Sequence, residues 1–275
     1  MAAKLTTDDA TYVRELVRRH AAIQLDESKH YLLEQRLERL AQQLGCDGMG
    51  DLVGRARAGT AQVDTHIVEA LTTHETSFFR DLHPFEALRA EVIPALLGLR
   101  AGQRTLRFWS AACSTGQEPY SLAMLLLDVF PQLRDWAVSI LATDLSHPVV
   151  QRAASGRFSQ LEVNRGLPAT RLVKHFHREG LDWVINPAPR ALVQFRQMNL
   201  LHNWGLPQPQ DVILLRNVLI YFDQDTKRSL LQRVRQWLAP GGALLLGAAE
   251  STLTVCDDIW ERVQVGSTSY YRVRP

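Results

Sequence analysis

The stretch LRFWSAACSTGQEPYSLAMLLLDVF, residues 106–130, decides the fold of this chain. Its first four residues alternate as in a strand, small residues follow up to Gly116, and an apolar helix with Pro119 in its first turn is expected to run to Phe130. A strand, a tight turn and a helix in this order form the topology of a nucleotide-type site, because the helix N-terminus offers free N–H groups to a ligand.

This turn differs from the common phosphate-binding turns. It has neither the GxGxxG spacing nor a GK[ST] sequence, so no phosphate ligand is predicted. Glu118 stands at the mouth of the turn, and an acidic side chain there suits a ligand that carries a positive charge. An ordinary strand-to-helix turn is the alternative interpretation.

Composition excludes several classes of protein. The chain has 275 residues, enough for two domains, and its net charge of +2 is too small to indicate nucleic acid by itself. Cys46, Cys113 and Cys256 are isolated, which argues against a disulfide framework or a zinc site and fits a reducing cytoplasm. No apolar run has the length of a membrane span, and the N-terminus does not resemble a signal peptide. We expect a cytoplasmic monomer that is not inserted in a membrane.

Residues 1 to about 72 are expected to be all helical. In the helix expected from Asp26 to Leu44, Lys29, Arg36 and Arg39 fall within roughly a quarter of a turn of one another, beside the apolar stripe. This basic stripe is a candidate docking face for an acidic partner. A solvated helix flank is the alternative.

The segment 72–85 is the expected linker between two domains. Its two adjacent phenylalanines need burial, and Arg80 follows them directly. This pattern favours a strap packed against the second domain, with Arg80 directed at an anionic group. Surface pairing of Arg80 with Glu75 or Asp81 is the alternative.

Two polar residues stand where expected parallel strands end. Asp144 follows the apolar strand 137–143, where it could accept both hydroxyls of a ribose; a helix N-cap formed together with Ser146 is the alternative. Asn217 ends the buried strand that begins at Asp211, at the carboxyl edge where ligands bind. The chain therefore predicts an open, mostly parallel sheet with an antiparallel C-terminal hairpin.

Between these two strands, residues 157 to about 197 are turn-rich and indicate a small antiparallel insertion. It includes a hairpin around Gly180. His175 and His177 stand two residues apart and would face the same side of a strand, but no third ligand is evident. We expect no metal.

Five stretches now carry a specific resemblance. THETSFFRD, WSAACSTGQEPYS, ATDLS, NLL and RNVLIYF, in this order, resemble the motifs of the chemotaxis receptor methyltransferases, the CheR family. The likeness covers nearly the whole chain. It implies an α/β fold with a Rossmann-like class I methyltransferase domain over residues 73–275, an inserted small antiparallel β-subdomain, and an all-α N-terminal docking domain over residues 1–72.

The resemblance also implies an activity and a partner. The family transfers a methyl group from S-adenosylmethionine to glutamates of chemoreceptors, leaving glutamyl methyl esters and S-adenosylhomocysteine. The partner would be the cytoplasmic helical domain of a receptor, faced by the basic stripe, and no nucleic acid is expected. A glutamate nucleophile has a reference pKa of about 4.3, so no general base is needed at pH 7.

Roles of single residues follow from the same resemblance. Arg80 and Tyr221 would be catalytic, with Tyr221 near the transferring methyl group. Asp144 would bind the ribose, Glu118 would lie near the methionyl part, and Asn199 would lie on the adenine side. The residues expected to contact the cofactor are His74, Thr76, Arg80, Ala112, Glu118, Asp144, Asn199, Leu200, Asn217 and Val218.

Two departures from the family pattern matter. His74 stands where the strap commonly has asparagine, which puts one cofactor hydrogen bond in doubt. The loop HREGLD, residues 177–182, is shorter than the loop of members that dock a receptor tether peptide, so we expect tether independence. A methyltransferase of another substrate such as RNA, or a non-catalytic cofactor-binding scaffold, are the alternatives; a dehydrogenase is disfavoured by the missing glycine fingerprint.

Overall fold

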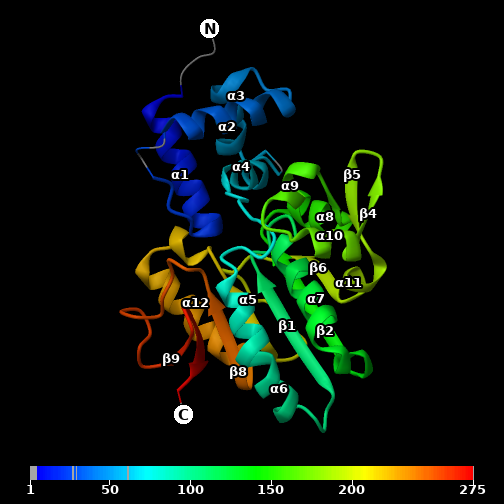
Figure 1. The fold of residues 1–275 in the computed structure, drawn as a ribbon. Helices are drawn as coiled ribbons and strands as arrows, with labels where there is room; N and C mark the ends of the chain where they lie inside the picture. Colours follow the sequence, from blue (N-terminus) through cyan, green and yellow to red (C-terminus); the bar gives the residue numbers. More distant parts are fainter. Residues whose placement is uncertain (1–4, 27, 29, 61, 275) are drawn as a thin grey trace. The chain divides into compact units, whose positions relative to one another are not determined.

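The computed structural model describes residues 5–26, 28, 30–60 and 62–274 (Figure 1). They divide into two compact units. The first unit contains the described residues up to Thr73 together with Tyr221–Thr226, and the second contains His74–Ile220 and the chain from Lys227 onward. Among the described residues, no helix has both the length and the apolar character that crossing a membrane requires.

The first unit is a helical domain, as expected. Its helices are α1 (Thr7–Ala21), α2 (His30–Gln43), α3 (Gly48–Arg57) and α4 (Val63–Leu71). Each contributes side chains at helical spacing to a shared core, in which Val13, Leu37 and Leu52 are fully buried. The expected start of the second helix at Asp26 was early, since α2 begins at His30.

A seven-stranded sheet forms the centre of the second unit. Its strand order is β6-β2-β1-β7-β8-β10-β9, with the first five strands parallel and the last two antiparallel. The strands are β1 (Thr105–Ala111), β2 (Ala137–Asp144), β6 (Val193–Gln197), β7 (Gln210–Leu215), β8 (Leu238–Leu246), β9 (Trp260–Val265) and β10 (Thr268–Val273). The order reverses between β1 and β7, and ligands of such sheets bind at the carboxyl ends of strands at this switch point.

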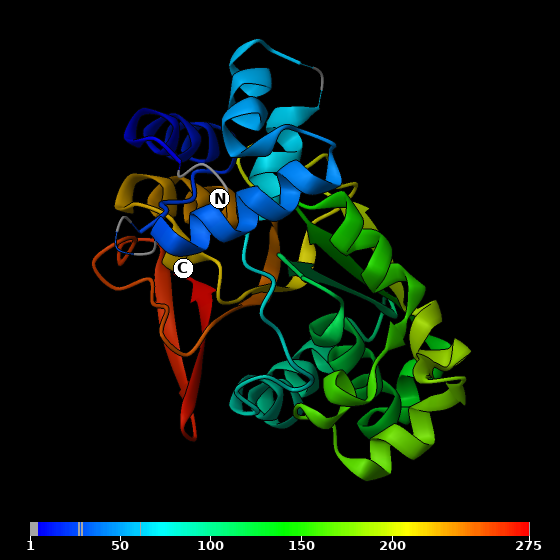
Figure 2. The ribbon, with the colours of Figure 1, turned by 90° about the horizontal axis from the view of Figure 1, so that it is seen from above.

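Helices cover the sheet, and the red β9–β10 hairpin lies at one edge of it (Figure 2). They are α5 (His83–Ala87), the π-helical turn η2 (Leu88–Val92), α6 (Ile93–Leu99), α7 (Gln117–Val129), the 3-10 turn η3 (Pro131–Asp135), α8 (His147–Ser155) and α12 (Gln224–Trp237). A further 3-10 turn, η4 (Leu219–Tyr221), leads from β7 toward α12. The apolar body of α7 is buried on nearly all sides, which explains why its sequence lacks a polar face.

The insertion contains a small three-stranded sheet of order β3-β5-β4. Its elements are β3 (Arg157–Phe158), α9 (Gln160–Asn164), α10 (Ala169–His175), β4 (Phe176–Glu179), β5 (Asp182–Ile185) and α11 (Pro187–Ala191). The expected boundary near residue 197 was wrong, because β6 pairs in parallel with β2 and belongs to the main sheet. The hairpin around Gly180 is confirmed, as β4 pairs antiparallel with β5.

The two histidines of the insertion do not share a strand face. His175 ends α10 and is buried, with Nε2 2.8 Å from Asp128 Oδ1. His177 lies on β4, is exposed, and contacts Asn186 through Nδ1. The strand spacing assumed for this pair was wrong because His175 belongs to α10, a helix that was not predicted, and β4 begins only at Phe176.

Candidate functional site

The turn after β1 has an unusual backbone. Ala112, Ser114 and Gly116 have φ values of 60°, 50° and 96°, so two non-glycine residues adopt the left-handed region within five positions. Such conformations cost free energy and persist where the surroundings fix them, often at functional sites. Here Cys113 N–H donates to the carbonyl of Thr143 at 2.8 Å, which ties the turn to the end of β2.

Asp144 organises this turn from the neighbouring strand. Its Oδ2 accepts the Ser114 N–H at 2.9 Å, and its Oδ1 accepts the Ser146 N–H at 3.2 Å. The residue is only 7% exposed. The N-cap residue of α8 is Ser146, which the alternative interpretation named together with Asp144, and Asp144 itself precedes the cap. Its carboxylate instead lies at the carboxyl ends of β1 and β2, where a ribose-binding acid is expected.

Glu118 is buried in the first turn of α7, and both carboxylate oxygens have partners. Oε1 accepts the Ser110 hydroxyl at 2.7 Å, and Oε2 accepts Nη1 of Arg216 at 2.8 Å. The negative charge that we assigned to the mouth of the turn is therefore already opposed by a buried arginine.

Arg216 was missed by sequence reasoning, although a charged residue at the end of an apolar strand was a usable signal. Its side chain is 1% exposed. Besides Glu118, it donates through Nη2 to the Arg80 carbonyl at 2.7 Å and to Asp81 Oδ2 at 3.0 Å. Arg216 thus joins the end of β7 to α7 and to the strap.

The strap is packed against the second unit as expected. Phe78 and Phe79 are buried, and the Phe78 ring lies 5.0 Å from the Phe158 ring of the insertion. The strap also bonds to the β1 turn and to α7: the His74 carbonyl accepts the Ser114 hydroxyl at 2.8 Å, and the Phe79 N–H donates to the Ser121 hydroxyl at 2.9 Å.

Arg80 does not form the surface ion pairs that the alternative interpretation required. Its Nη1 donates to the Glu75 carbonyl at 2.7 Å. The carboxylates of Glu75 and Asp81 instead pair with Arg165 and Arg216. Among the described residues, the Arg80 guanidinium has no carboxylate partner, and the side chain is half-buried, as is that of Thr76.

Asn199 and Leu200 lie in a turn that follows β6. Asn199 Oδ1 accepts the Leu201 N–H at 2.9 Å. The Leu200 carbonyl accepts the indole N–H of Trp204 at 3.2 Å and Nη1 of Arg233 at 2.8 Å. Arg233 also stacks over the Trp204 ring at 4.3 Å, and burial lowers its pKa. Trp204 and Arg233 were not predicted as neighbours of the site. The one signal available in the sequence was Trp204 itself, an isolated tryptophan in a polar stretch.

The loop after β7 contains Asn217 and Val218, both half-buried, and Asn217 has a φ of 57°. It is fastened by Glu250, whose carboxylate accepts N–H groups of this loop. Tyr221 follows in the chain but belongs to the first unit, where its carbonyl accepts the Gln24 N–H at 2.9 Å.

The proposed docking residues have different surroundings. Lys29 lies outside the described residues. Arg36 is half-buried, and its Nη1 donates to the carbonyls of Leu71 and Thr72 at 2.9 and 2.8 Å, so it caps the end of α4. Arg39 is exposed on α2. Arg36 thus has a structural role that its position in a basic stripe did not reveal.

The site contains no activated thiol. Cys113 is buried, and burial, together with the charges of Asp144 and Glu118, raises the pKa of its thiol well above the ordinary value. Burial likewise raises the pKa of the nearby Tyr120 to about 12. In the described part of the chain, no group of three or more His, Cys, Asp or Glu side chains could hold a metal ion.

Comparison with known proteins gives a consistent result. Residues 8–72 match the family model of the CheR methyltransferase all-alpha domain, and residues 74–265 match that of its S-adenosylmethionine-binding domain. Chemotaxis protein methyltransferase 1 of Pseudomonas aeruginosa is 40% identical over 272 residues, which are 97% of this chain and 98% of that protein. Chemotaxis protein methyltransferase Cher2 of Pseudomonas putida is 39% identical, with coverage of 97% and 98%. Chemotaxis protein methyltransferase 1 of Vibrio cholerae is 37% identical, with 92% of each chain covered.

These matches confirm the family resemblance of the five sequence motifs. They also confirm the fold class, the S-adenosylmethionine cofactor and the enzyme class, a protein-glutamate O-methyltransferase. Both domains match in the expected order and the relatives are covered almost completely. This chain therefore belongs to the CheR family of S-adenosylmethionine-dependent methyltransferases.

Proposed function

We propose that this enzyme methylates glutamate side chains in the cytoplasmic helical domain of chemoreceptors and thereby serves sensory adaptation. The observation that carries the proposal is the buried Asp144 carboxylate at the carboxyl end of β2, held by two N–H groups beside the strained β1 turn. It stands in a chain that matches CheR proteins through both domains.

The polar groups at this edge suit the parts of S-adenosylmethionine. When bound, this cofactor supplies a methyl group activated by a sulfonium cation. Asp144 would accept the ribose hydroxyls, and Arg80, with no carboxylate partner among the described residues, would hold the carboxylate of the methionyl part. The remaining contacts would come from His74, Thr76, Ala112, Glu118, Asn199, Leu200, Asn217 and Val218.

The catalytic task of the protein is to orient two groups and to exclude water. The receptor glutamate is ionised at pH 7 and needs no base, which fits a site whose cysteine has a raised pKa. By the family resemblance, Tyr221 would lie near the transferring methyl group. Because opposite charges neutralise each other during the transfer, a site that sheds water and fixes the geometry is sufficient.

Docking of the receptor would use the basic stripe of the helical domain. Arg39 offers an exposed positive charge for an acidic helical surface. Arg36 would contribute little to docking because its guanidinium donates to two backbone carbonyls. Lys29 stays a docking candidate on the sequence pattern alone. Replacing Arg39 with glutamate should raise the KM for a receptor fragment and leave cofactor binding unchanged.

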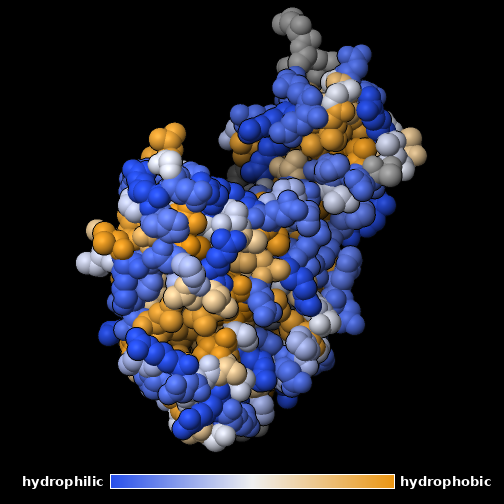
Figure 3. Space-filling view, turned by 90° about the vertical axis from the view of Figure 1, so that its right-hand side faces the viewer, coloured by the Kyte–Doolittle hydropathy of each residue, from blue (hydrophilic) through white to orange (hydrophobic). Residues whose placement is uncertain are grey.

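We propose further that the enzyme needs no receptor tether peptide. In support, the connection between β4 and β5 consists of Gly180 and Leu181 alone. On the face drawn in Figure 3, orange apolar patches interrupt a mostly hydrophilic surface. The exposed apolar side chains of the insertion are distributed over α9, α10 and the turn between β4 and β5, which contain Leu161, Val173 and Leu181 respectively. Receptors with and without their C-terminal tail should be methylated at equal rates; a clear advantage of the tailed receptor contradicts this proposal.

The proposed site is tested by calorimetry followed by methyl transfer. We expect the wild-type protein to bind S-adenosylmethionine and S-adenosylhomocysteine, and Asp144→Ala and Asp144→Asn to lose most of this affinity. Asp257→Ala, which removes an exposed carboxylate elsewhere in the second unit, is the control. Radiolabelled transfer to receptor fragments then tests the substrate. Transfer to RNA instead, or binding without transfer, would favour the alternatives of an RNA methyltransferase or a scaffold.

The proposed location is the cytoplasm. The three cysteines are all free, as is usual in a reducing compartment, and the proposed substrate is the cytoplasmic part of a receptor. Sedimentation of the purified protein tests the monomeric state expected from the sequence.

A further inference from the structure

Glu250 follows β8 and binds three backbone N–H groups with one carboxylate. Its Oε2 accepts the N–H groups of Asn217 and Gly247, both at 2.7 Å, and its Oε1 accepts the Ile220 N–H at 3.3 Å. Among the described residues, no arginine, lysine or histidine pairs with this carboxylate. Its negative charge therefore faces backbone N–H groups of two segments, the loop that begins at Asn217 and the chain directly after β8.

This loop needs such a fastening. Asn217 is a non-glycine residue with a φ of 57°, a conformation that costs free energy and persists only when its surroundings enforce it. Glu250 bonds the loop at both ends, at Asn217 and at Ile220. Charge-assisted hydrogen bonds to a carboxylate are stronger than neutral ones. Two of them hold the loop between β7 and η4, and the third, from the Gly247 N–H, ties the same carboxylate to the end of β8.

Gly247 shows how closely the loop approaches β8. A Cβ atom at this position would lie 2.7 Å from Asn217 Nδ2, 2.7 Å from Glu250 Oε2 and 2.8 Å from the Asn217 backbone nitrogen. The last of these neighbours is main chain and cannot rotate away. A glycine is therefore required for the carboxylate and the loop to meet.

We propose that Glu250 is a positioning residue of the methyltransferase, which acts by fixing the loop that presents Asn217 and Val218 to the cofactor. The inference rests on the proposed site, because it assumes that these two residues act in it. Glu250 itself touches only backbone groups of the protein. A merely structural role would lower stability and leave the cofactor affinity of the folded enzyme unchanged.

The test compares Glu250→Gln and Glu250→Ala with Glu261→Gln. Glu261 pairs with Arg272 on the exposed hairpin, so its replacement removes a carboxylate without touching the loop. We expect the cofactor affinity of Glu250→Gln to fall by about tenfold or more, because the amide cannot accept all three hydrogen bonds. The affinity of Glu250→Ala should fall further, because alanine accepts none of them. Glu261→Gln should match the wild type.

Amide hydrogen exchange separates positioning from stability. In Glu250→Gln, the amides of Asn217 and Ile220 should lose protection while the strand amides of β1 and β7 keep theirs. Wild-type affinity and kcat/KM in Glu250→Gln, with or without a lower Tm, would overturn the inference. If Glu250→Ala does not fold, the glutamine variant still decides the question.

A second test disturbs the close approach of the loop to Gly247 while the Glu250 carboxylate stays in place. Gly247→Ala should weaken cofactor binding by about tenfold, whereas Gly98→Ala, which has open space around it on α6, should leave binding unchanged. Asp144→Ala distinguishes the two levels of the proposal. If it binds the cofactor normally, the proposed site fails; if it loses binding while Glu250→Gln and Gly247→Ala do not, only the inference about Glu250 fails.

Discussion

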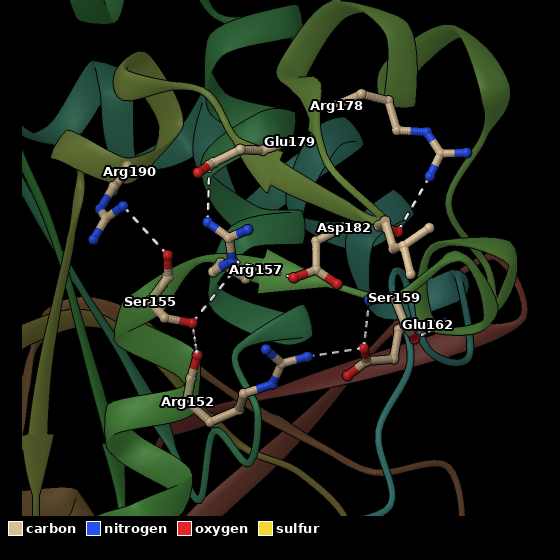
Figure 4. A network of polar contacts seen from close by, with 10 residues as sticks. Arg152, Ser155, Arg157, Ser159, Glu162, Arg178, Glu179, Asp182 and Arg190 are labelled. Carbon is tan, nitrogen blue, oxygen red and sulfur yellow. Dashed lines mark hydrogen bonds and ion pairs between the residues drawn. The ribbon is translucent and has the colours of Figure 1, made fainter.

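Two regions of the second unit are rich in arginine–carboxylate pairs, but they differ in exposure. At the carboxyl edge of the main sheet, Arg216 pairs with Glu118, and the two side chains are 1% and 11% exposed. In the insertion, Arg157 reaches toward Glu179 and Asp182 (Figure 4), and its partners are 58% and 38% exposed. Charges in water are screened and gain little by pairing, whereas a buried charge that loses its partner is costly. An arginine–carboxylate pair therefore contributes strongly to the stability of the site in one region and little to stability at the surface in the other.

The largest effect is expected from Arg216→Met. Without the guanidinium, Glu118 becomes a buried charge with no cation, and loss of one partner of a buried pair costs about 3–5 kcal/mol. Urea unfolding followed by tryptophan fluorescence measures this, since all six tryptophans lie in the second unit. The double variant Glu118→Gln/Arg216→Met should regain a large part of the loss. A loss below about 1 kcal/mol would show that the pair is not an anchor.

Arg80→Lys should separate activity from stability. The Arg80 side chain is half-buried and bonds only a carbonyl within its own strap, so its replacement should leave the unfolding midpoint unchanged. Lysine keeps the charge but loses the two-pronged geometry, so we expect kcat/KM to fall by about tenfold to a hundredfold. Steady-state kinetics with a receptor fragment measure this. Arg165→Lys, an exposed replacement close to the strap, is the matched control.

An intermediate case is Asp128 on α7, which fastens α10 of the insertion. Burial opposes ionisation of Asp128, but hydrogen bonds from Lys174, His175 and Arg171 outweigh it and lower its pKa. Because the pKa of Asp128 is lower in the folded state, its ionised form stabilises the fold at any pH above the unfolded-state pKa of about 3.9. This stabilisation is lost as the pH falls through the folded-state pKa. Asp128→Asn should therefore cost about 1–2 kcal/mol at pH 7.

The pH dependence provides the control for this prediction. The difference between wild type and Asp128→Asn, measured by urea unfolding, should shrink as the pH drops below about 4. A difference that is the same at pH 7 and pH 3 would assign the effect to packing and not to charge.

The smallest effect is expected from Arg157→Ala. Its side chain is 35% exposed, and surface pairs of this kind contribute about 0–1 kcal/mol. Added salt should reduce even this contribution. A loss comparable to that of Arg216→Met would remove the distinction between the two regions.

Most of the fold could be predicted because its signals are local. The strand, turn and helix at residues 106–130 appear as expected in β1 and α7, and Asp144 and Asn217 stand at strand ends. The placement of β6 could not be predicted, because a short strand carries the same alternating pattern in either sheet. The helix α10, which includes His175, was missed entirely, because its stretch was interpreted as turns leading into a hairpin.

The partners of the site residues were beyond the sequence. Glu118 meets Arg216 across 98 positions, and Asn217 meets Glu250 across 33. No periodicity or spacing encodes such pairs, since they arise only when the sheet brings distant segments to one edge. Arg36 gives the converse lesson: its helical position was predicted, but its bond to the end of α4 was not.

The membership of Tyr221–Thr226 in the first unit limits how the enzyme can be divided. This hexapeptide lies between β7 and α12 in the chain, yet it is grouped with the helical domain, and Gln24 bonds the Tyr221 carbonyl. A chimera that exchanges residues 1–73 between two relatives would combine one enzyme's helices with the other's tyrosine segment. The unit of exchange is therefore discontinuous, and grafted helices should be accompanied by their own residues 221–226.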